Sequence, residues 1–451
     1  MTVDKDKYKD RDVCRTGSAT RPGSRTKSKS IGQHGMARIG IVGGGIIGCA
    51  TALHLIARGH DVTVFEQDAA GLPASVGNAG IMAIPEIDPI ARPDMLLSAP
   101  RWLADPLGPL TLRWSDLPAL TPWLIAFLRS ARPAQAARTR TALLGLMRTV
   151  LDDHRDLAGM AALVDPVQHT GAMTIFDAQT SLDAAFRHES ETARLLGFSI
   201  ERLSPAEVRA RIPALEGALA GGIFSAGYHT FRHPETFLRD LQAQLRARAT
   251  FVEAGIATLR PGSDGITLTT SSGARHLFDK AVIAAGVWSR DLVRGLGLRV
   301  PLETERGYNT TFADPKVTLP MPIFFSEHGF CATPFDNALR VGGAVELARP
   351  DAPANFARAK AMRTKMRRYV PSLPETGGTE WMGRRPSTPD SLPVIGLSPD
   401  DPRIALAFGH GHLGLTLSAT TGRLVADLFD KGEQPTLAPF SIRRFQRGKT
   451  T

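Results

Sequence analysis

Three glycines, Gly43, Gly45 and Gly48, form a G-x-G-x-x-G pattern of the kind that binds phosphate groups. In such a turn the first glycine permits a tight bend, the second lets a phosphate approach the backbone, and the third lets helix and strand pack closely. Glu66 follows 18 positions after the last glycine, where a carboxylate accepts hydrogen bonds from ribose hydroxyls and disfavours a 2′-phosphate. The spacing therefore predicts a site for the pyrophosphate and ribose of a dinucleotide. The alternative is a glycine-rich turn without a ligand.

The segments around these glycines have the periodicity that such a site needs. Residues 38–42 are a short apolar run that ends at the glycines, as a buried parallel strand does. Residues 46–58 place apolar side chains at helical spacing, and Gly59 ends that helix. Residues 61–66 alternate and are rich in β-branched side chains, which predicts a second strand. This order places the free N–H groups and the positive dipole end of the helix beside the phosphates.

Two further glycine-rich segments bear on the choice between NAD and FAD. Residues 75–80 (Ser-Val-Gly-Asn-Ala-Gly) form a small polar loop that can run beside a flat ring system. Residues 409–416 precede a helix, so a second helix N-terminus can face the partly negative edge of a reduced isoalloxazine. An ordinary loop is the alternative for each segment alone. Together with the first motif they favour FAD, because it is long enough to reach all of these elements.

Composition indicates a globular protein of two domains with a basic extension. The chain has 451 residues and a net charge of +10, and no apolar run reaches the roughly 20 residues of a membrane-spanning helix. The first 35 residues hold nine Lys or Arg and four Asp, half of the net excess, and lack an apolar signal core. We expect residues 1–36 to be disordered, either as an upstream start before Met36 or as a functional basic arm. The remaining chain is only mildly basic, which argues against nucleic-acid binding.

The three cysteines are scattered through the chain, at positions 14, 49 and 331. This arrangement predicts neither a disulfide framework nor a metal site, and a reducing cytoplasm is the default location.

The fold class expected is α/β with two discontinuous domains. A Rossmann-like FAD-binding domain with a β-meander is assigned to residues 37–88, 232–300 and 378–451. Residues 251–286 carry the meander's turn signals, and the last run, 280–285, is apolar enough to return to a parallel sheet. A substrate-binding domain, built on a large mixed or antiparallel sheet with helices, is assigned to residues 89–231 and 301–377.

Taken together, the motifs resemble the D-amino-acid oxidase superfamily of flavoenzymes, and most of all its bacterial D-amino-acid dehydrogenase branch. The matching pieces, in chain order, are residues 43–48 with Glu66, 75–80, 284–289, 306–308, 340–343 with Glu346, 383–390 with 393–396, and 409–414. They span the chain from about residue 37 to Phe445, and their ordered combination is specific. His412 and Leu415 depart from the family pattern, in which a small polar residue and a Trp are usual, so the substrate stays open.

The resemblance implies which residues contact the cofactor. They are Gly43, Gly45, Ile46, Ile47, Gly48, Glu66, Gln67, Ser75, Asn78, Ala79, Gly80, Ile256, Ala285, Gly286, Trp288, Gly383, Gly411, His412, Leu413, Gly414, Leu415 and Thr416. Relatives that attach flavin covalently use a cysteine in the segment that here reads Gly383 to Arg385, and none is present. We therefore expect noncovalent FAD and no metal.

Three side chains are candidates for substrate contact. Arg385 is the first candidate for binding a substrate carboxylate, because a guanidinium fork holds a carboxylate with two hydrogen bonds. A structural salt bridge is the alternative, and Arg384 is its competitor. The Tyr308 hydroxyl is a second candidate for the carboxylate, against a packed tyrosine with a satisfied hydroxyl. His412 is a candidate substrate contact, against a structural histidine.

The predicted reaction is hydride transfer from Cα of a D-amino acid, or a cyclic one such as D-proline or D-hydroxyproline, to flavin N5. The imine then hydrolyses to a 2-oxo acid and ammonia. The electron acceptor is a quinone or respiratory chain, or O₂. A glycine- or sarcosine-type oxidase and a noncatalytic flavin-binding subunit are the alternatives. Residues 117–128 are apolar and followed by arginines, which predicts either peripheral docking on the inner face of the cytoplasmic membrane or a core helix.

Overall fold

The computed structural model describes residues 35–68 and 73–446, apart from residues 94, 96–102, 104 and 106. The extension predicted to be disordered lies almost wholly outside the described residues, as does Cys14. The other two cysteines, Cys49 and Cys331, are buried free thiols. No helix within these described ranges is long and apolar enough to cross a membrane.

A six-stranded sheet carries the glycine motif, in the order β10-β2-β1-β14-β21-β20. Its strands are β1 (Arg38–Val42), β2 (Asp61–Glu66), β10 (Thr250–Glu253), β14 (Lys280–Ile283), β20 (Val394–Leu397) and β21 (Ile404–Phe408). All neighbours pair in parallel except β20, which runs antiparallel to β21. The prediction that residues 280–285 return to a parallel sheet is confirmed over β14.

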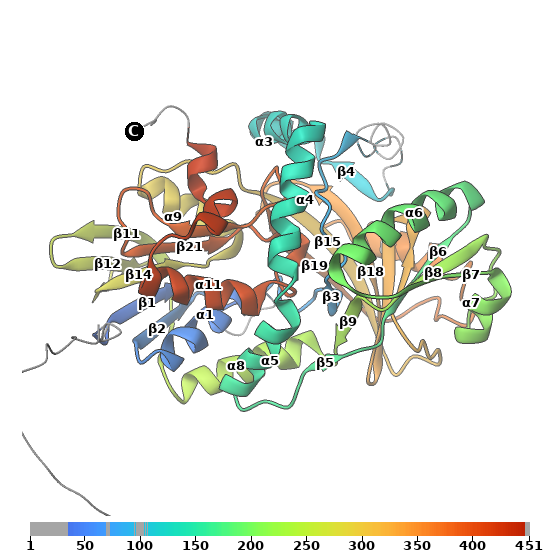
Figure 1. The fold of residues 1–451 in the computed structure, drawn as a ribbon, viewed down its shortest axis with the longest axis horizontal. Coiled ribbons are helices and arrows are strands. Elements are labelled where there is room, and N and C mark those ends of the chain that lie inside the picture. The colour runs from blue at the N-terminus through green and yellow to red at the C-terminus, as the bar shows by residue number, and fades with distance from the viewer. Residues whose placement is uncertain are drawn as a thin grey trace, which may run out of the picture. The chain divides into compact units, whose positions relative to one another are not determined.

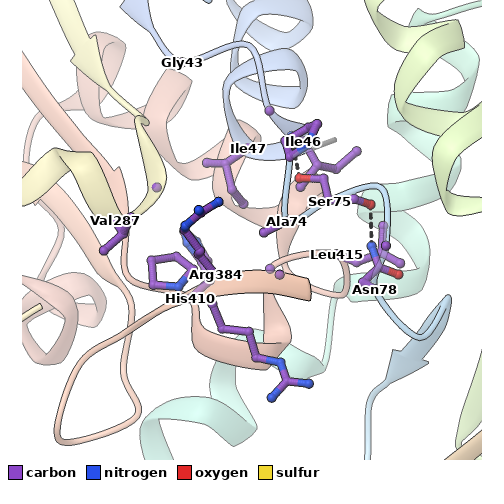
Figure 2. Close-up of a pocket in the computed structure, with 18 of the residues that line it drawn as sticks. Gly43, Ile46, Ile47, Ala74, Ser75, Asn78, Val287, Arg384, His410 and Leu415 are labelled. Atoms are coloured by element: carbon purple, nitrogen blue, oxygen red, sulfur yellow. Dashed lines mark hydrogen bonds between the residues drawn. The ribbon is translucent and has the colours of Figure 1, made fainter. Parts of the chain in front are cut away.

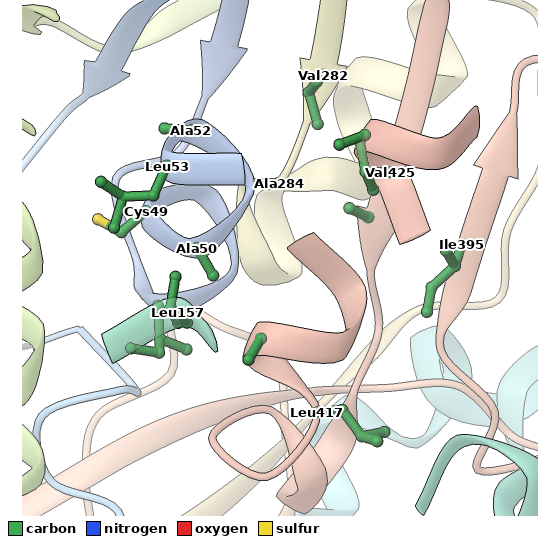
Figure 3. Packing of buried hydrophobic residues seen from close by; sticks show 14 of the residues in the cluster. Cys49, Ala50, Ala52, Leu53, Leu157, Val282, Ala284, Ile395, Leu417 and Val425 are labelled. Carbon is green, nitrogen blue, oxygen red and sulfur yellow. The ribbon is translucent and has the colours of Figure 1, made fainter. Parts of the chain in front are cut away.

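Helices cover one face of this sheet (Figure 1). They are α1 (Ile46–Ala57), α5 (Val150–Met160), α8 (Pro234–Arg246) and α11 (Ser418–Lys431). Figure 3 shows the contact of α1 with α5 and α11, where Ala50 and Leu53 lie near Leu157 and Val425. Gly422 lets the two helices approach closely, because a Cβ there would lie 2.7 Å from the carbonyl carbon of Ala50. This packing holds α1, and with it the glycine turn, rigidly against the sheet.

The other face of the six-stranded sheet is covered by a β-meander and a short helix. The meander comprises β11 (Ile256–Gly262), β12 (Gly265–Thr270) and β13 (Arg275–Phe278), and the helix is α9 (Ser289–Gly295). Leu268 and Phe278 of the meander pack on the strands, so closely that a Cβ at Gly40 of β1 would lie 2.7 Å from each. The predicted meander is confirmed.

A second, larger sheet follows the order β19-β15-β18-β17-β16-β6-β8-β7, and β4 pairs with β18. The strands are β4 (Leu110–Leu112), β6 (Ala172–Phe176), β7 (Ile200–Leu203), β8 (Gly221–Ser225), β15 (Glu303–Ala313), β16 (Ile323–Phe325), β17 (Phe330–Phe335), β18 (Ala338–Leu347) and β19 (Thr379–Ser387). Most pairs are antiparallel, while β16 with β6 and β18 with β4 are parallel. The predicted α/β class with a large mixed sheet is therefore confirmed.

The remaining elements surround the large sheet and join it to the first (Figure 1). A small sheet consists of β3 (Ile81–Ala83), β9 (Tyr228–Phe231) and β5 (Val167–Gln168). The helices are α3 (Leu117–Ser130), α4 (Pro133–Met147), α6 (Gln179–Leu196), α7 (Pro205–Arg211) and α10 (Ala357–Met366). α7 begins at a capping box, in which Ser204 and Glu207 satisfy each other's backbone N–H groups.

Strand β19 joins the segment expected in the cofactor-binding domain to the large sheet. Residues 378–451 were assigned to the cofactor-binding domain, but β19 pairs along its whole length with β15 of the large sheet. The assignment relied on the resemblance of residues 383–390 to a segment that lines the flavin. Pairing over 68 to 84 positions of sequence leaves no local signal, so the division into two domains stays a proposal.

Candidate functional site

A cavity of about 930 Å³ opens at the carboxyl ends of the parallel strands, between the six-stranded and the large sheet. In open α/β sheets ligands bind at this edge, because the turns that follow the strands converge there. The lining includes the turn after β1, the end of β2, the turn after β14 and the turn after β21. Four segments far apart in sequence thus meet on one cavity. Figure 2 shows three of them, at Gly43, Val287 and His410.

The turn after β1 has the geometry of a phosphate site. Gly43 has φ +109°, a left-handed conformation that side chains rarely adopt, and a Cβ there would lie 2.4 Å from the carbonyl oxygen of Ala284. At Gly48 a Cβ would lie 1.8 Å from the carbonyl oxygen of Gly43. The N–H of Gly44 donates to Glu66 Oε2 at 2.7 Å, which ties the acidic residue to the turn. The first turn of α1 therefore presents its N–H groups to the cavity beside a fixed carboxylate.

The loop of residues 75–80 lies directly beside this turn. Ser75 Oγ accepts a hydrogen bond from the N–H of Ile46 at 3.2 Å, and the side chain of Asn78 donates to the carbonyl of Ser75 (Figure 2). Asn78 Oδ1 also accepts from the N–H of Gly80 at 2.7 Å, an Asx turn that fixes the end of the loop. The loop is thus shaped by its own polar side chains.

Two side chains of the large sheet hold the same loop from the other side. Asn309 donates to the carbonyl of Gly77 at 2.7 Å, and Arg340 Nη1 donates to the carbonyls of Val76 and Asn78. Burial lowers the pKa of Arg340 to about 10, so it stays charged near neutrality. Sequence reasoning missed both residues as site residues, since only the folded chain brings β15 and β18 to this loop.

One face of the β15–β19 pair forms a wall of the cavity. Alternation along β19 places Trp381, Gly383 and Arg385 on one face, and their cross-strand partners on β15 are Asn309, Gly307 and Glu305. The indole of Trp381 lies against two glycines, because a Cβ at Gly77 or Gly383 would fall 2.2 or 2.0 Å from it. The absence of side chains at Gly383 and Gly307 makes room for the indole of Trp381 and the guanidinium of Arg385, so these two side chains form this part of the wall.

Arg385 extends from this wall toward the cavity. Its guanidinium lies over Gly307, where a Cβ would be 2.2 Å from Nη2. Within the described ranges its hydrogen-bond partner is the carbonyl of Ala344, at 3.2 Å from Nη1, and an arginine has five donors. Burial lowers the pKa of Arg385, while the field of buried Glu305 opposes that shift. The remaining donors can therefore bind an anion, and arginine stays protonated at this site.

The other two candidates for binding the substrate carboxylate, Arg384 and Tyr308, already have hydrogen-bond partners within the protein. Arg384 also lines the cavity, but its Nε donates to the carbonyl of Pro350 at 2.7 Å. Tyr308 is 1% exposed, and its hydroxyl donates to Glu346 and accepts from the N–H of Asn355 at 3.1 Å. The proposed contact between the Tyr308 hydroxyl and a substrate is therefore corrected, because that hydroxyl is already satisfied within the large sheet.

The turn after β21 brings two histidines with different surroundings. His410 is 4% exposed, and Nε2 lies 2.9 Å from the Thr421 hydroxyl, while burial lowers its pKa to about 3. His412 opens onto the cavity, and enclosure by the protein lowers its pKa, with Glu86 opposing and Arg385 adding to that shift. Both imidazoles are therefore uncharged near pH 7. Both residues line the cavity, and His412 is the more exposed of the two.

Most of the predicted contact residues lie along this cavity, but four do not reach its wall. Gly48 contacts the Gly43 carbonyl, as its packing role requires, and Gly80 lies under the ring of Phe335. Leu413 is buried in the core beneath α11. Thr416 Oγ1 accepts from the N–H of Ala83 at 3.0 Å. These four positions support the cavity from behind its wall, and their role as cofactor contacts stays a prediction.

The donor set of the cavity fits a flavin dinucleotide. Helix N–H groups and Glu66 suit a pyrophosphate and a ribose, and the aromatic side chain of Trp381 on the cavity wall suits a ring system. No group of three or more His, Cys, Asp or Glu with metal-binding geometry occurs among the residues placed by the structure. The fold and this cavity together define the class of the protein, a dinucleotide-binding flavoprotein of the α/β type.

Comparison with known proteins gives the family. The model of the DAO family, described as FAD dependent oxidoreductase, matches residues 38–428. A D-amino-acid oxidase of Bradyrhizobium diazoefficiens is 34% identical over 417 residues, covering 90% of this chain and 98% of the relative. A D-amino acid dehydrogenase of Paramagnetospirillum magneticum is 33% identical over 410 residues, covering 87% and 94%. The chain belongs to the DAO family, and it is an FAD-dependent oxidoreductase.

Solved structures agree on the fold. Glycine oxidase from Geobacillus kaustophilus superposes with a TM-score of 0.69 at 24% identity, covering 92% of this chain and all of that one. L-proline dehydrogenase from P. horikoshii also gives a TM-score of 0.69, at 16% identity and 92% and 98% coverage. At these identities the similarity concerns the fold alone.

Proposed function

We propose that this protein oxidises a D-amino acid, by hydride transfer from Cα to noncovalently bound FAD. The observation that carries the proposal is Arg385, a mostly buried guanidinium on the wall of the cavity with donors available for a carboxylate. The names of the two curated relatives, a D-amino-acid oxidase and a D-amino acid dehydrogenase, support the D-configuration.

The residues of the chain act by binding, orienting and excluding water. Arg385 fixes the substrate carboxylate through two charge-assisted hydrogen bonds and thereby sets the position of Cα. Trp381 and the glycines of β15 and β19 close the wall, which lowers the polarity around the reacting carbon. When bound, FAD supplies the hydride acceptor. No protein base at the amine is required, since the free amine is the reactive form, and the imine hydrolyses in water to a 2-oxo acid and ammonia.

The cofactor contacts proposed for the chain follow the same geometry. The first turn of α1 and Glu66 hold the pyrophosphate and ribose, while the loop of residues 75–80 and the turn of residues 409–415 hold the ring system. No cysteine lies in the segment Gly383 to Arg385, which favours dissociable FAD.

The electron acceptor is proposed to be a membrane quinone or respiratory chain, reached by peripheral docking. The support is α3, where Leu120 and Trp123 are buried while Ile125 and Leu128 are 44% and 56% exposed. Trp114, just before the helix, is 67% exposed. Exposed apolar side chains beside arginines are typical of a surface that binds the membrane interface.

A second candidate function is a glycine- or sarcosine-type oxidase that uses O₂. The observation in its favour is the turn of residues 409–416, where His412 opens onto the cavity in place of a small residue and leaves less room for a substrate side chain.

Anaerobic mixing of the purified yellow protein with matched D- and L-amino acids, glycine and sarcosine tests the proposal. We expect the visible flavin absorbance to bleach with D-amino acids and not with their L-enantiomers. Bleaching by glycine or sarcosine in preference supports the second candidate, and bleaching by none of these contradicts both. The reaction is then repeated in air with a peroxide assay and, separately, with an artificial electron acceptor. Peroxide formation indicates an oxidase, and turnover with the artificial acceptor alone indicates a dehydrogenase.

A further inference from the structure

A carboxylate that the reaction does not use lines the same cavity as Arg385. Glu86 lies just beyond β3, in a turn closed by its own N–H, which donates to the carbonyl of Ala83 at 3.1 Å. Its Oε1 accepts a hydrogen bond from the hydroxyl of Tyr228 at 2.9 Å. No basic side chain within the described ranges lies at ion-pair distance from this carboxylate, and the nearby cations are paired elsewhere. The charge of Glu86 therefore faces the cavity without a protein counter-ion.

The nearby cations belong to a different acid. His188 lies 2.6 Å from Asp88, and Arg140 lies 3.5 Å from Asp88 and 3.6 Å from Glu191. These pairs neutralise Asp88 on the outer side of the segment. Because these cations are bound to Asp88 and Glu191, the carboxylate of Glu86, two residues before Asp88, remains available to a ligand.

Tyr228 donates to the carboxylate of Glu86 and thereby positions it. Tyr228 is 7% exposed and directly opposite Ala83 in the β3–β9 pair, so its position is fixed by the sheet. Burial, and after it the field of Glu86, raise the pKa of Tyr228, so the phenol keeps its proton and remains a donor. Glu189 of α6 lies behind, and burial together with Glu86 raises its pKa to about 7. Below about pH 7 Glu189 is therefore protonated and adds no negative charge behind Glu86.

The wall between Glu86 and Arg385 is apolar. Ile81, Ala83, Phe324 and Cys331 line the cavity there, and they pack with Tyr228 in one cluster. His412 shares this region, since the fields of both Glu86 and Arg385 act on it. The cavity thus presents a cation, an apolar stretch with a neutral imidazole, and an anion.

We propose that Glu86 is a specificity-determining residue, which binds the cationic head of a basic side chain, so that the preferred substrates are D-amino acids of the lysine, ornithine or arginine class. This inference rests on the proposed oxidation of D-amino acids. Arg385 binds the α-carboxylate, the apolar stretch contacts the methylene stem, and Glu86 with its backing from Tyr228 binds the ammonium or guanidinium.

The α-amine is the less suitable partner for Glu86. A carboxylate beside an amine stabilises the protonated form, because opposite charges favour ionisation of both groups. The protonated amine cannot release a hydride from Cα, so such a contact would oppose the reaction. When Glu86 instead binds a cation at the end of the substrate side chain, the contact strengthens binding and leaves the α-amine free to lose its proton.

Matched substrates that differ only in charge test the proposal. For the wild-type holoenzyme we expect kcat/KM with an artificial acceptor to be about 10–100-fold higher for D-lysine than for D-norleucine, and likewise for D-arginine over D-citrulline, as one charge-assisted hydrogen bond implies. In Glu86→Gln, which keeps an acceptor for Tyr228, both ratios should fall toward one. Glu191→Gln, a half-exposed carboxylate on α6, is the control and should keep the wild-type ratios.

The results distinguish failure of this inference from failure of the proposed function. Flavin bleaching by D-amino acids without a preference for the cationic member, or an equal loss for all substrates in Glu86→Gln, overturns the role of Glu86 and leaves the proposed function standing. If no amino acid bleaches the flavin, the proposed function fails. In that case the change in flavin spectrum on binding D-lysine or D-norleucine still measures the charge preference, and equal Kd values overturn it.

Discussion

Arg340 connects the large sheet to the loop of residues 75–80, and replacing Arg340 by methionine should release that loop. The guanidinium donates to the hydroxyl of Thr311 at 2.9 Å and to the carbonyls of Val76 and Asn78. Its ring contact with Phe335, 5.1 Å from the centroid, fixes the plane of the fork. Methionine keeps the apolar stem and removes all of these donors. The substitution therefore measures the contribution of these hydrogen bonds alone.

The expected loss follows from the hydrogen bonds removed. A hydrogen bond from a charged donor contributes about 1.5–3 kcal/mol, and two loop carbonyls lose their partner at once. Water re-solvates part of the loop after it moves, so we expect about 1.4–2.8 kcal/mol to appear as a 10–100-fold weaker Kd for FAD. Arg340→Lys keeps the charge without the fork and should fall between wild type and Arg340→Met.

Titration of apoprotein with FAD, followed by quenching of flavin fluorescence, measures this loss. Arg155→Met on α5 is the control, because that side chain is 67% exposed and its ion pair is with Asp152 of the same helix. A folded Arg340→Met protein that binds FAD as tightly as wild type would refute the reasoning.

Three further changes test separate parts of the account. Gly48→Ala places a Cβ 1.8 Å from the Gly43 carbonyl and should lower the FAD content of the purified protein at least about tenfold, as overpacking at a backbone atom implies; full FAD content would contradict this. Tyr308→Phe should lower the free energy of unfolding by about 1–3 kcal/mol, because buried Glu346 loses its donor, and should leave KM unchanged. A large rise in KM would return the hydroxyl to the substrate site. The pKa of Glu189, raised from 4.5 to about 7, means that the folded state binds a proton that the unfolded state releases. Its contribution to stability is complete below pH 4.5 and is lost as the pH rises through about 7. The free energy of unfolding should therefore decline between these pH values by on the order of 1–3 kcal/mol more in wild type than in Glu189→Gln, and parallel profiles would exclude this titration.

The parts of the fold that sequence predicts are those with local signals. The strand, glycine turn and helix of residues 38–57 form one continuous periodic segment, and the structure places each boundary within a residue or two of the expected one. Near the C-terminus, the predicted glycine turn of residues 409–416 lies between β21 and α11, and Gly409 and Gly411 adopt the positive φ that this turn requires. Apolar periodicity and turn chemistry are encoded within a few residues, so they can be read directly.

The site depends on contacts that no local pattern encodes. Trp381 closes over Gly77, more than 300 positions earlier, and Arg340 binds carbonyls of the same loop across 262 and 264 positions. Tyr308 shows the converse, since its type suits a substrate contact while the pairing of β15 with β18 commits its hydroxyl to Glu346. Sequence therefore supplied the cofactor turns, and folding decided which polar side chains remain available to a ligand.

The central claim is that Arg385 anchors the substrate carboxylate, and anaerobic rapid-mixing kinetics of flavin reduction test it most directly. With the best D-amino acid of the wild type, Arg385→Met should raise the substrate Kd about 100-fold, the loss expected for a bidentate charged contact. Arg384→Met should leave the Kd within about threefold, less than one charged hydrogen bond. An unchanged Kd in Arg385→Met, or the larger loss in Arg384→Met, would contradict the account.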